Sequence, residues 1–147
     1  FLDLALWGYE DIKEFKFLDY PLEVVENSTN LVLQELQMLN EDNQITQFGK
    51  KSLTLGVHPR FAFMILRANE LGFAYEACLL SAMLSEKDIF KNMSFNCDIY
   101  SRFLHLYEKD FNSAYISSHN AKNVLKQAEF FYNKLKRFKK LIKSFFF

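Results

Sequence analysis

The sequence predicts a mainly α-helical protein in which a small winged-helix-like unit with minimal β structure precedes a helical bundle. Half of its 147 residues are hydrophobic, which is enough to bury a real core in one domain or two small ones. Only four Gly and two Pro interrupt the chain, a composition typical of long helices joined by few turns. Apolar residues also recur at helical spacing in several segments. We expect residues 1–57 to form the winged-helix-like unit and residues 58–147 the bundle, packed as one body.

The N-terminal segment begins with a short helical piece that Gly8 interrupts, followed by a second short helix that Asp11 is placed to cap. Pro21 disfavours helical backbone at Tyr20 and therefore predicts an extended entry. From Leu22 to Leu39 apolar residues recur at helical spacing, with acidic residues in the first turn. This pattern predicts an amphipathic helix over residues 22–39.

A turn over residues 40–44 leads into "QIT", which is long enough for a very short strand only. Thr46 then stands where its hydroxyl can accept a hydrogen bond from an orphan backbone N–H, which predicts a helix over residues 47–54. The order helix, turn, short strand, helix is typical of a winged-helix unit. A β-hairpin of the length that a wing needs is hard to find in the sequence.

The step Gly49-Lys50 matches the end of a phosphate-binding loop, which reads G-x-x-x-x-G-K-[ST]. Gln44 stands at the first glycine position, so the backbone lacks the tight turn that cradles phosphate. Lys51 stands at the hydroxyl position, so no magnesium ligand is present. We therefore predict no nucleotide site here and a structural role for Thr46 and Gly49.

The C-terminal part reads as a series of helices. Pro59 suits the first position of a helix over residues 59–71, and because that helix is apolar nearly all round it should be buried. Gly72 ends it, and a helix over residues 74–86 follows. The remaining predicted elements are a loop rich in Asn and Ser around residues 91–96 and helices near residues 97–109 and 119–143.

The last of these helices has the clearest pattern. Its apolar residues fall on one face at about 100° per residue, and they are Ala121, Val124, Leu125, Ala128, Phe131, Tyr132, Leu135, Phe138 and Ile142. Beside that face runs a basic stripe made of Lys122, Lys126, Lys136, Arg137 and Lys140. The stripe is either a solvated flank next to a core seam or a surface that faces nucleic acid.

The net charge of zero hides a segregation of charge along the chain. Residues 1–90 carry 7 basic and 14 acidic side chains, whereas residues 91–147 carry 11 basic and 4 acidic ones. Either the C-terminal part meets a polyanion or an acidic partner, or the two parts face each other. No stretch approaches 18 uncharged apolar residues, which argues against a membrane span.

Motifs for independent catalysis or metal binding are missing from the sequence. Cys78 and Cys97 lie far apart without metal-ligand spacing. The alternatives are a disulfide between them and two buried free thiols, and we expect the free thiols. His58, His105 and His119 lack H-x-x-x-H or H-E-x-x-H spacing, so a metal site is not predicted. No nucleophile–base arrangement and no carboxylate pair stands out, so we expect no enzymatic activity from this segment.

Two arginines are further candidates for contact with nucleic acid. Arg60 and Arg67 lie seven residues apart and share a helix face with Phe63. They could reach phosphate or stack on a base. The alternative is that each pairs with a neighbouring acid such as Glu70 or Glu76.

Four other residues invite both a structural and a functional interpretation. Lys50 and Lys51 either form a solvated helix flank or touch a backbone phosphate. Trp7 follows three apolar residues and is predicted to anchor the core. His58 precedes Pro59 and is predicted to mark a helix entry.

Residues 4–90 resemble the helicase-associated region of DEAH-box ATP-dependent helicases, most closely the bacterial HrpB type. The pieces that carry the likeness are "WG" followed by "FLDYP", then "LQMLNEDNQITQFGKK", "HPRFAFMIL" and "ACLLSAMLSEKD". None of these pieces is specific alone, but their order and spacing over nearly ninety residues make the match strong. Residues 97–143 resemble the later helices of the family more weakly.

The resemblance implies a winged helix, which includes Thr46 and Gly49, leading into a helical bundle often called the ratchet. In the family these line the exit channel for a single strand and sit against two RecA-like domains. Those domains hold ATP, Mg²⁺ and the DEAH box, and their motifs are absent from this sequence, so no cofactor is expected here.

The expected partners are therefore single-stranded RNA or DNA and the RecA-like domains of the same parent chain, with no membrane. The chain starts at Phe1 rather than Met and ends at "KSFFF", so we expect a segment of a longer cytoplasmic protein. The competing hypothesis is a protein-interaction or regulatory docking module that touches no nucleic acid.

Overall fold

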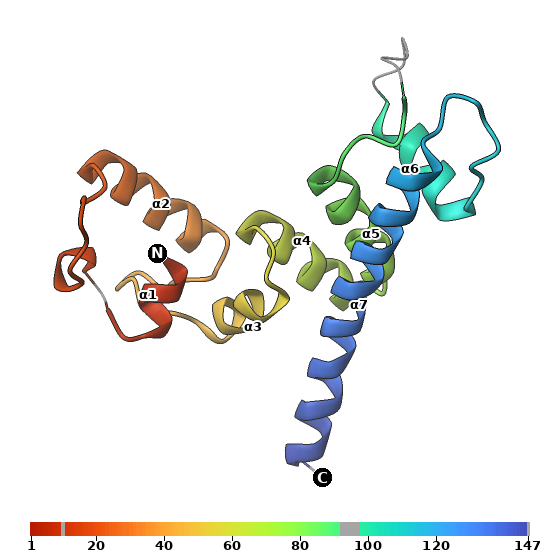
Figure 1. Cartoon of the computed structure of the whole chain (residues 1–147). Coiled ribbons are helices and arrows are strands. Elements are labelled where there is room, and N and C mark those ends of the chain that lie inside the picture. The colour runs from red at the N-terminus through yellow and green to blue at the C-terminus, as the bar shows by residue number, and fades with distance from the viewer. Residues whose placement is uncertain (10, 92–97, 147) are drawn as a thin grey trace. The chain divides into compact units, whose positions relative to one another are not determined.

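Helices make up most of the computed structural model, which describes residues 1–9, 11–91 and 98–146, with side chains described as far as Arg137. In these ranges the elements are α1 (Leu2–Leu6), the 3₁₀ helix η1 (Ile12–Glu14), α2 (Glu23–Glu35), α3 (Gln47–Leu55), α4 (Pro59–Glu70), α5 (Ala74–Ser85), α6 (Ile99–Glu108) and α7 (Ser118–Phe146). Figure 1 shows them in chain order. The mainly α prediction is confirmed. The only β pairing in the described ranges is two isolated bridges, Leu39 with Ile45 and Phe90 with Ile116.

The chain divides into two compact units, unit 1 over Phe1–Met64 and unit 2 over Ile65–Phe147, and the division falls inside α4. Unit 1 holds α1, η1, α2, α3 and the first part of α4. Its core is a set of apolar side chains that solvent hardly reaches, namely Leu2, Ile12, Leu33, Met38, Leu39, Leu55 and Ala62. The predicted boundary between residues 57 and 58 stays a prediction.

Helix α2 ends at Glu35, four residues before the predicted end at Leu39. The reason is a left-handed turn at Gln37, whose φ is 58°. The Gln37 N–H donates to the Gln34 carbonyl at 2.8 Å, and the Met38 N–H donates to the Leu33 carbonyl at 2.8 Å. These two bonds form a Schellman motif, which normally has glycine at the left-handed position. Leu33 and Met38, the apolar pair expected across that motif, are both buried.

Thr46 joins this turn to the start of α3. Its hydroxyl accepts a hydrogen bond from the Gly49 N–H at 3.0 Å and donates to the Gln37 carbonyl at 2.7 Å. Its own backbone N–H donates to the Met38 carbonyl at 2.9 Å. Thr46 is thus the N-cap of α3, at the position predicted for it.

Gly49 is required by a close approach rather than by a phosphate. A Cβ at this position would lie 2.3 Å from the Met38 carbonyl oxygen and 2.9 Å from Cγ1 of Ile45. The first turn of α3 therefore packs directly on the backbone that follows α2. This contact supplies the structural role that the sequence predicted for Thr46 and Gly49.

Replacing Thr46 with alanine should lower the free energy of unfolding by about 1 kcal/mol, the typical cost of losing an N-cap side chain. The same change removes the donor to the Gln37 carbonyl. Urea unfolding followed by circular dichroism measures the effect. Thr46→Ser keeps the hydroxyl and is the matched control, so equal midpoints for the alanine and serine variants would contradict the capping role.

Trp7 is not the core anchor that the sequence predicted. It follows the last residue of α1 and is 63% exposed. Its ring packs on Phe15 with the centroids 6.2 Å apart, and Leu2 is the buried residue of α1. A helix of five residues has room for little more than one inward-facing position.

In unit 2, α5 packs along α7 and also contacts α6, as Figure 1 shows. Helix α5 contributes Cys78, Leu79 and Ala82, which are fully buried. The predicted face of α7 is confirmed at five buried positions, Ala121, Val124, Ala128, Phe131 and Leu135. Leu125 and Tyr132 are half-buried, while the side chains of Phe138 and Ile142 lie outside the described residues.

Arg102 of α6 binds the segment that follows α5. Arg102 Nη2 lies 2.8 Å from Asp88 Oδ2, and Arg102 Nε donates to Asp88 Oδ1 at 3.0 Å. The guanidinium also lies 4.8 Å from the centroid of the Phe90 ring. The Arg102 hydrogen bonds lower the pKa of the Asp88 carboxyl, and Asn120 of α7 donates to the Asp88 carbonyl at 2.7 Å. The segment after α5 is thereby held against two helices.

Candidate nucleic-acid interface

The basic stripe of α7 is exposed wherever the structure describes it. Lys122, Lys126, Lys136 and Arg137 are all exposed, because the opposite side of α7 is buried in the core of unit 2. The side chain of Lys140 lies outside the described residues. Glu129 is also exposed, and at three residues after Lys126 it shares this flank. The stripe is therefore a row of cations that contains one carboxylate.

Two lysines of α7 lie over aromatic rings, a feature that the sequence analysis missed. Lys136 Nζ is 4.2 Å from the centroid of Tyr132, and Lys134 Nζ is 4.6 Å from that of Phe130. Both pairs have the spacing of four residues that brings side chains together on a helix. This spacing could have predicted the two lysine–aromatic pairs from the sequence. Lys136 thus places a basic group beside an aromatic ring.

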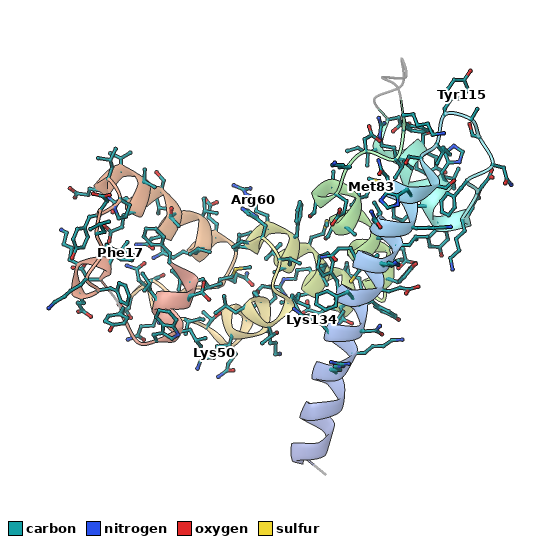
Figure 2. All side chains as sticks on the ribbon, viewed as in Figure 1. Phe17, Lys50, Arg60, Met83, Tyr115 and Lys134 are labelled. Carbon is teal, nitrogen blue, oxygen red and sulfur yellow. The ribbon has the colours of Figure 1, made fainter. Side chains whose placement is uncertain are left out.

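The other candidate cations are dispersed. Lys50 and Lys51 are exposed on α3, and Arg60 is exposed at the start of α4. Figure 2 shows Lys50 and Arg60 at opposite edges of unit 1, so the structure does not bring these two together. The Arg60 N–H donates to Nδ1 of His58 at 3.3 Å, which is the helix-entry role predicted for that histidine.

Arg67 has the acidic partner that the sequence offered as an alternative to phosphate. Its Nη1 lies 2.9 Å from Glu70 Oε2, one turn further along α4. Both side chains are substantially exposed, and a surface pair of this kind contributes little to stability. Arg67 is thus a weaker candidate for nucleic acid than the cations of the basic stripe.

No family model matches the chain. It is similar to the ATP-dependent RNA helicase HrpA homolog of Haemophilus influenzae, with 32% identity over 94 residues that cover 59% of this chain and 7% of the relative.

Two solved structures of Escherichia coli HrpB have the same fold. One, described as a DExH-box NTPase, matches at 24% identity with a TM-score of 0.65 and covers 90% of this chain and 14% of that chain. In fold, this chain matches a segment of HrpB. The other, described as a DEAH/RHA helicase, matches at 22% identity with a TM-score of 0.69, and the match covers 92% of this chain and 15% of that chain.

The resemblance to HrpB-type helicases is therefore confirmed at the level of fold, and it extends well beyond residues 4–90. The chain spans about one seventh of the HrpB chains that it matches. The activity, substrates and partners of a whole helicase are consequently matters for proposal.

In the part of the chain that the structure describes, no three His, Cys, Asp or Glu side chains are placed to hold a metal ion. None of the described helices is long and apolar enough to cross a membrane. Cys78 is a buried free thiol as predicted, whereas Cys97 lies outside the described residues.

Burial raises the pKa of the Cys78 thiol to about 12. We expect this thiol to stay unreactive toward a disulfide reagent at about pH 8 while the chain is folded, because the reactive form is the thiolate. Cys97→Ser leaves Cys78 as the one thiol of the chain, so the measurement is unambiguous. Labelling should become rapid only in denaturant. Fast labelling of the folded variant would contradict the burial of Cys78.

Proposed function

We propose that this chain is a non-catalytic accessory segment of an HrpB-type DEAH-box ATP-dependent helicase. It guides single-stranded RNA or DNA and couples the movement of the motor to translocation. Residues 1–57 are the winged-helix-like part of this proposal, and residues 58–147 are the ratchet-like bundle. The observation that carries it is the exposed row of cations on α7, in a chain with the fold of an HrpB segment.

The basic stripe suits contact with a phosphate backbone. The apolar side of α7 is buried, so the cations stand on a rigid support. From Lys122 to Arg137 the helix rises by about 22 Å, at about 1.5 Å per residue, which offers contacts to several phosphates in a row. Lysine and arginine neutralise phosphate without reading bases, so binding should be tolerant of sequence.

The rest of the proposed machine lies in the parent chain. RecA-like domains bind ATP and Mg²⁺ there, and they are the proposed neighbours of this segment within the same protein. The coverage of 14% and 15% of the matched helicases is consistent with an accessory portion of such a chain.

The binding experiment uses fluorescence anisotropy of labelled single-stranded RNA and DNA between about 50 and 200 mM salt. If about three cations contact phosphates, log affinity should fall with log salt with a slope near −2, from about −0.7 per contact. Strands of different sequence should bind about equally. Failure of both strands to bind at the lowest salt, or binding that salt leaves unchanged, would contradict a guiding role for this segment.

A docking module remains the second candidate because of the surface of unit 1. Apolar side chains there are highly exposed, including Leu18 at 99% and Leu22 and Val24 at 75% each. Acidic residues Asp19 and Glu23 adjoin them in the sequence. Such a surface fits an apolar and basic protein partner rather than nucleic acid. In that case the salt titration with single strands would show no binding.

A further inference from the structure

Helix α6 carries three aromatic side chains on one side. Tyr100, Phe103 and Tyr107 are spaced by three and four residues, which places them in a row along the helix. The Phe103 and Tyr107 rings are stacked, with centroids 5.7 Å apart and an interplanar angle of 18°. Tyr100 is 66% exposed and Tyr107 is 49% exposed. This side of α6 therefore offers ring surface to solvent.

Helix α5 packs against both α6 and α7 and adds a further aromatic side chain, Tyr75. The pKa of Tyr75 on α5 is raised chiefly because burial disfavours the phenolate, and Tyr107 is among the neighbouring groups that add to the shift. The Tyr75 ring meets the Tyr132 ring edge to face, with centroids 5.5 Å apart. Lys136 lies over Tyr132. We call these five side chains the aromatic face, and they are Tyr75, Tyr100, Phe103, Tyr107 and Tyr132.

The aromatic face thus ends at a member of the basic stripe. Lys136 belongs to the stripe and lies over Tyr132 of the aromatic face, and Arg137 follows it as an exposed cation. Glu129 and Glu76 act on Tyr75 from nearby and raise its pKa further. Lys136 and Arg137 place positive charge at the Tyr132 end of the face, so phosphate is favoured there.

We propose that the aromatic face stacks the bases of a single strand whose phosphates lie along the basic stripe. A nucleotide presents a flat aromatic ring beside an anion, and the face presents flat aromatic rings beside cations. Stacking of this kind is tolerant of sequence because every base has a π-face. The charge of residues 65–147, with 13 basic and 8 acidic side chains, favours this occupant over a basic protein surface. The inference rests on the proposed function and assigns a base-binding role to residues outside the stripe.

Tyr107→Leu keeps an apolar side chain and removes the ring. Stacking contributes about 1–3 kcal/mol per base, so the variant should bind a labelled strand of about 12 nucleotides roughly 5- to 150-fold more weakly. The salt slope should stay the same because no charge has changed. Tyr107→Phe keeps the ring and is the matched control, with an affinity close to that of the unsubstituted chain.

Tyr100→Leu provides a second variant at a more exposed position, so the test survives a folding defect of Tyr107→Leu seen by circular dichroism. It should show a loss of the same kind. A strand whose sugars lack bases separates stacking from indirect effects, since parent and leucine variants should bind that strand equally.

Three results would overturn the inference. Leucine variants that bind the normal strand as tightly as the parent would show that the rings are not used. An equal loss on the strand without bases would show that the changes act through the backbone path. If the unsubstituted chain binds with the expected salt dependence in these two cases, the proposed function stands and only the base-stacking role of the aromatic face fails. If the unsubstituted chain binds no strand at all, the proposed function and the base-stacking role both fail, and the aromatic face is then a candidate surface for a protein.

Discussion

Replacing Gly49 with alanine should destabilise unit 1 by about 3 kcal/mol, at the upper end of the cost of overpacking. The added Cβ would meet the Met38 carbonyl oxygen at 2.3 Å, and a backbone oxygen cannot rotate away as a flexible side chain can. Helix α3 would have to move from the turn after α2. That movement would stretch the Thr46 hydroxyl bond to Gly49 and the Thr46 N–H bond to Met38.

The direction of the stability change distinguishes a close backbone approach at Gly49 from an ordinary helix interior. In an ordinary helix interior, alanine is favoured over glycine by up to about 1 kcal/mol. A more stable Gly49→Ala variant would therefore show that α3 does not approach Met38 closely. Urea unfolding followed by Trp7 fluorescence reports on unit 1, because Trp7 is the one tryptophan of the sequence. Lys51→Ala, at an exposed position of the same helix, is the control and should change stability little.

Sequence patterns predicted the helices well where local signals mark them. Thr46, Pro59 and Gly72 mark helix ends by capping, by fixed φ and by positive φ, and α3 and α4 have the expected bounds within a residue. The end of α2 escaped prediction because Gln37 adopts a left-handed φ without being glycine or asparagine. Trp7 was misplaced since neighbours in sequence do not show which side of a short helix meets the core.

The candidate site was predictable only along single helices. The basic stripe follows from the helical period alone, and Arg67 with Glu70 is a local pair. Asp88 lies in the segment after α5 and Arg102 lies 14 residues further on, in α6, so no spacing rule identifies the pair. The aromatic face depends on how α5, α6 and α7 pack, and Tyr75 meets Tyr132 only through that packing.

Reversing three cations of the basic stripe should remove most of the affinity for single strands at low salt. The variant changes Lys122, Lys126 and Arg137 to glutamate, all exposed and all outside the core face of α7. Each lost phosphate contact should flatten the salt slope by about 0.7, so the three together should flatten it by about 2. Binding should weaken about equally for strands of different sequence, because phosphate contacts carry no sequence information. Anisotropy measures the affinity, and circular dichroism checks the fold.

A matched triple reversal separates a local effect from a change in total charge. Lys13, Lys16 and Lys87 are exposed and lie outside the stripe, so changing them to glutamate alters the net charge by the same amount. If long-range attraction set by net charge dominates, both variants should lose affinity for the strand equally, mainly through a slower association rate. If the stripe cations contact the strand directly, only the stripe variant should lose affinity, and its salt slope should change. Equal losses would place the strand away from α7, and an unchanged stripe variant would leave Lys50, Lys51 and Arg60 as the remaining candidates. The same two variants in the full-length helicase would then show whether α7 matters once the motor domains add their own contacts.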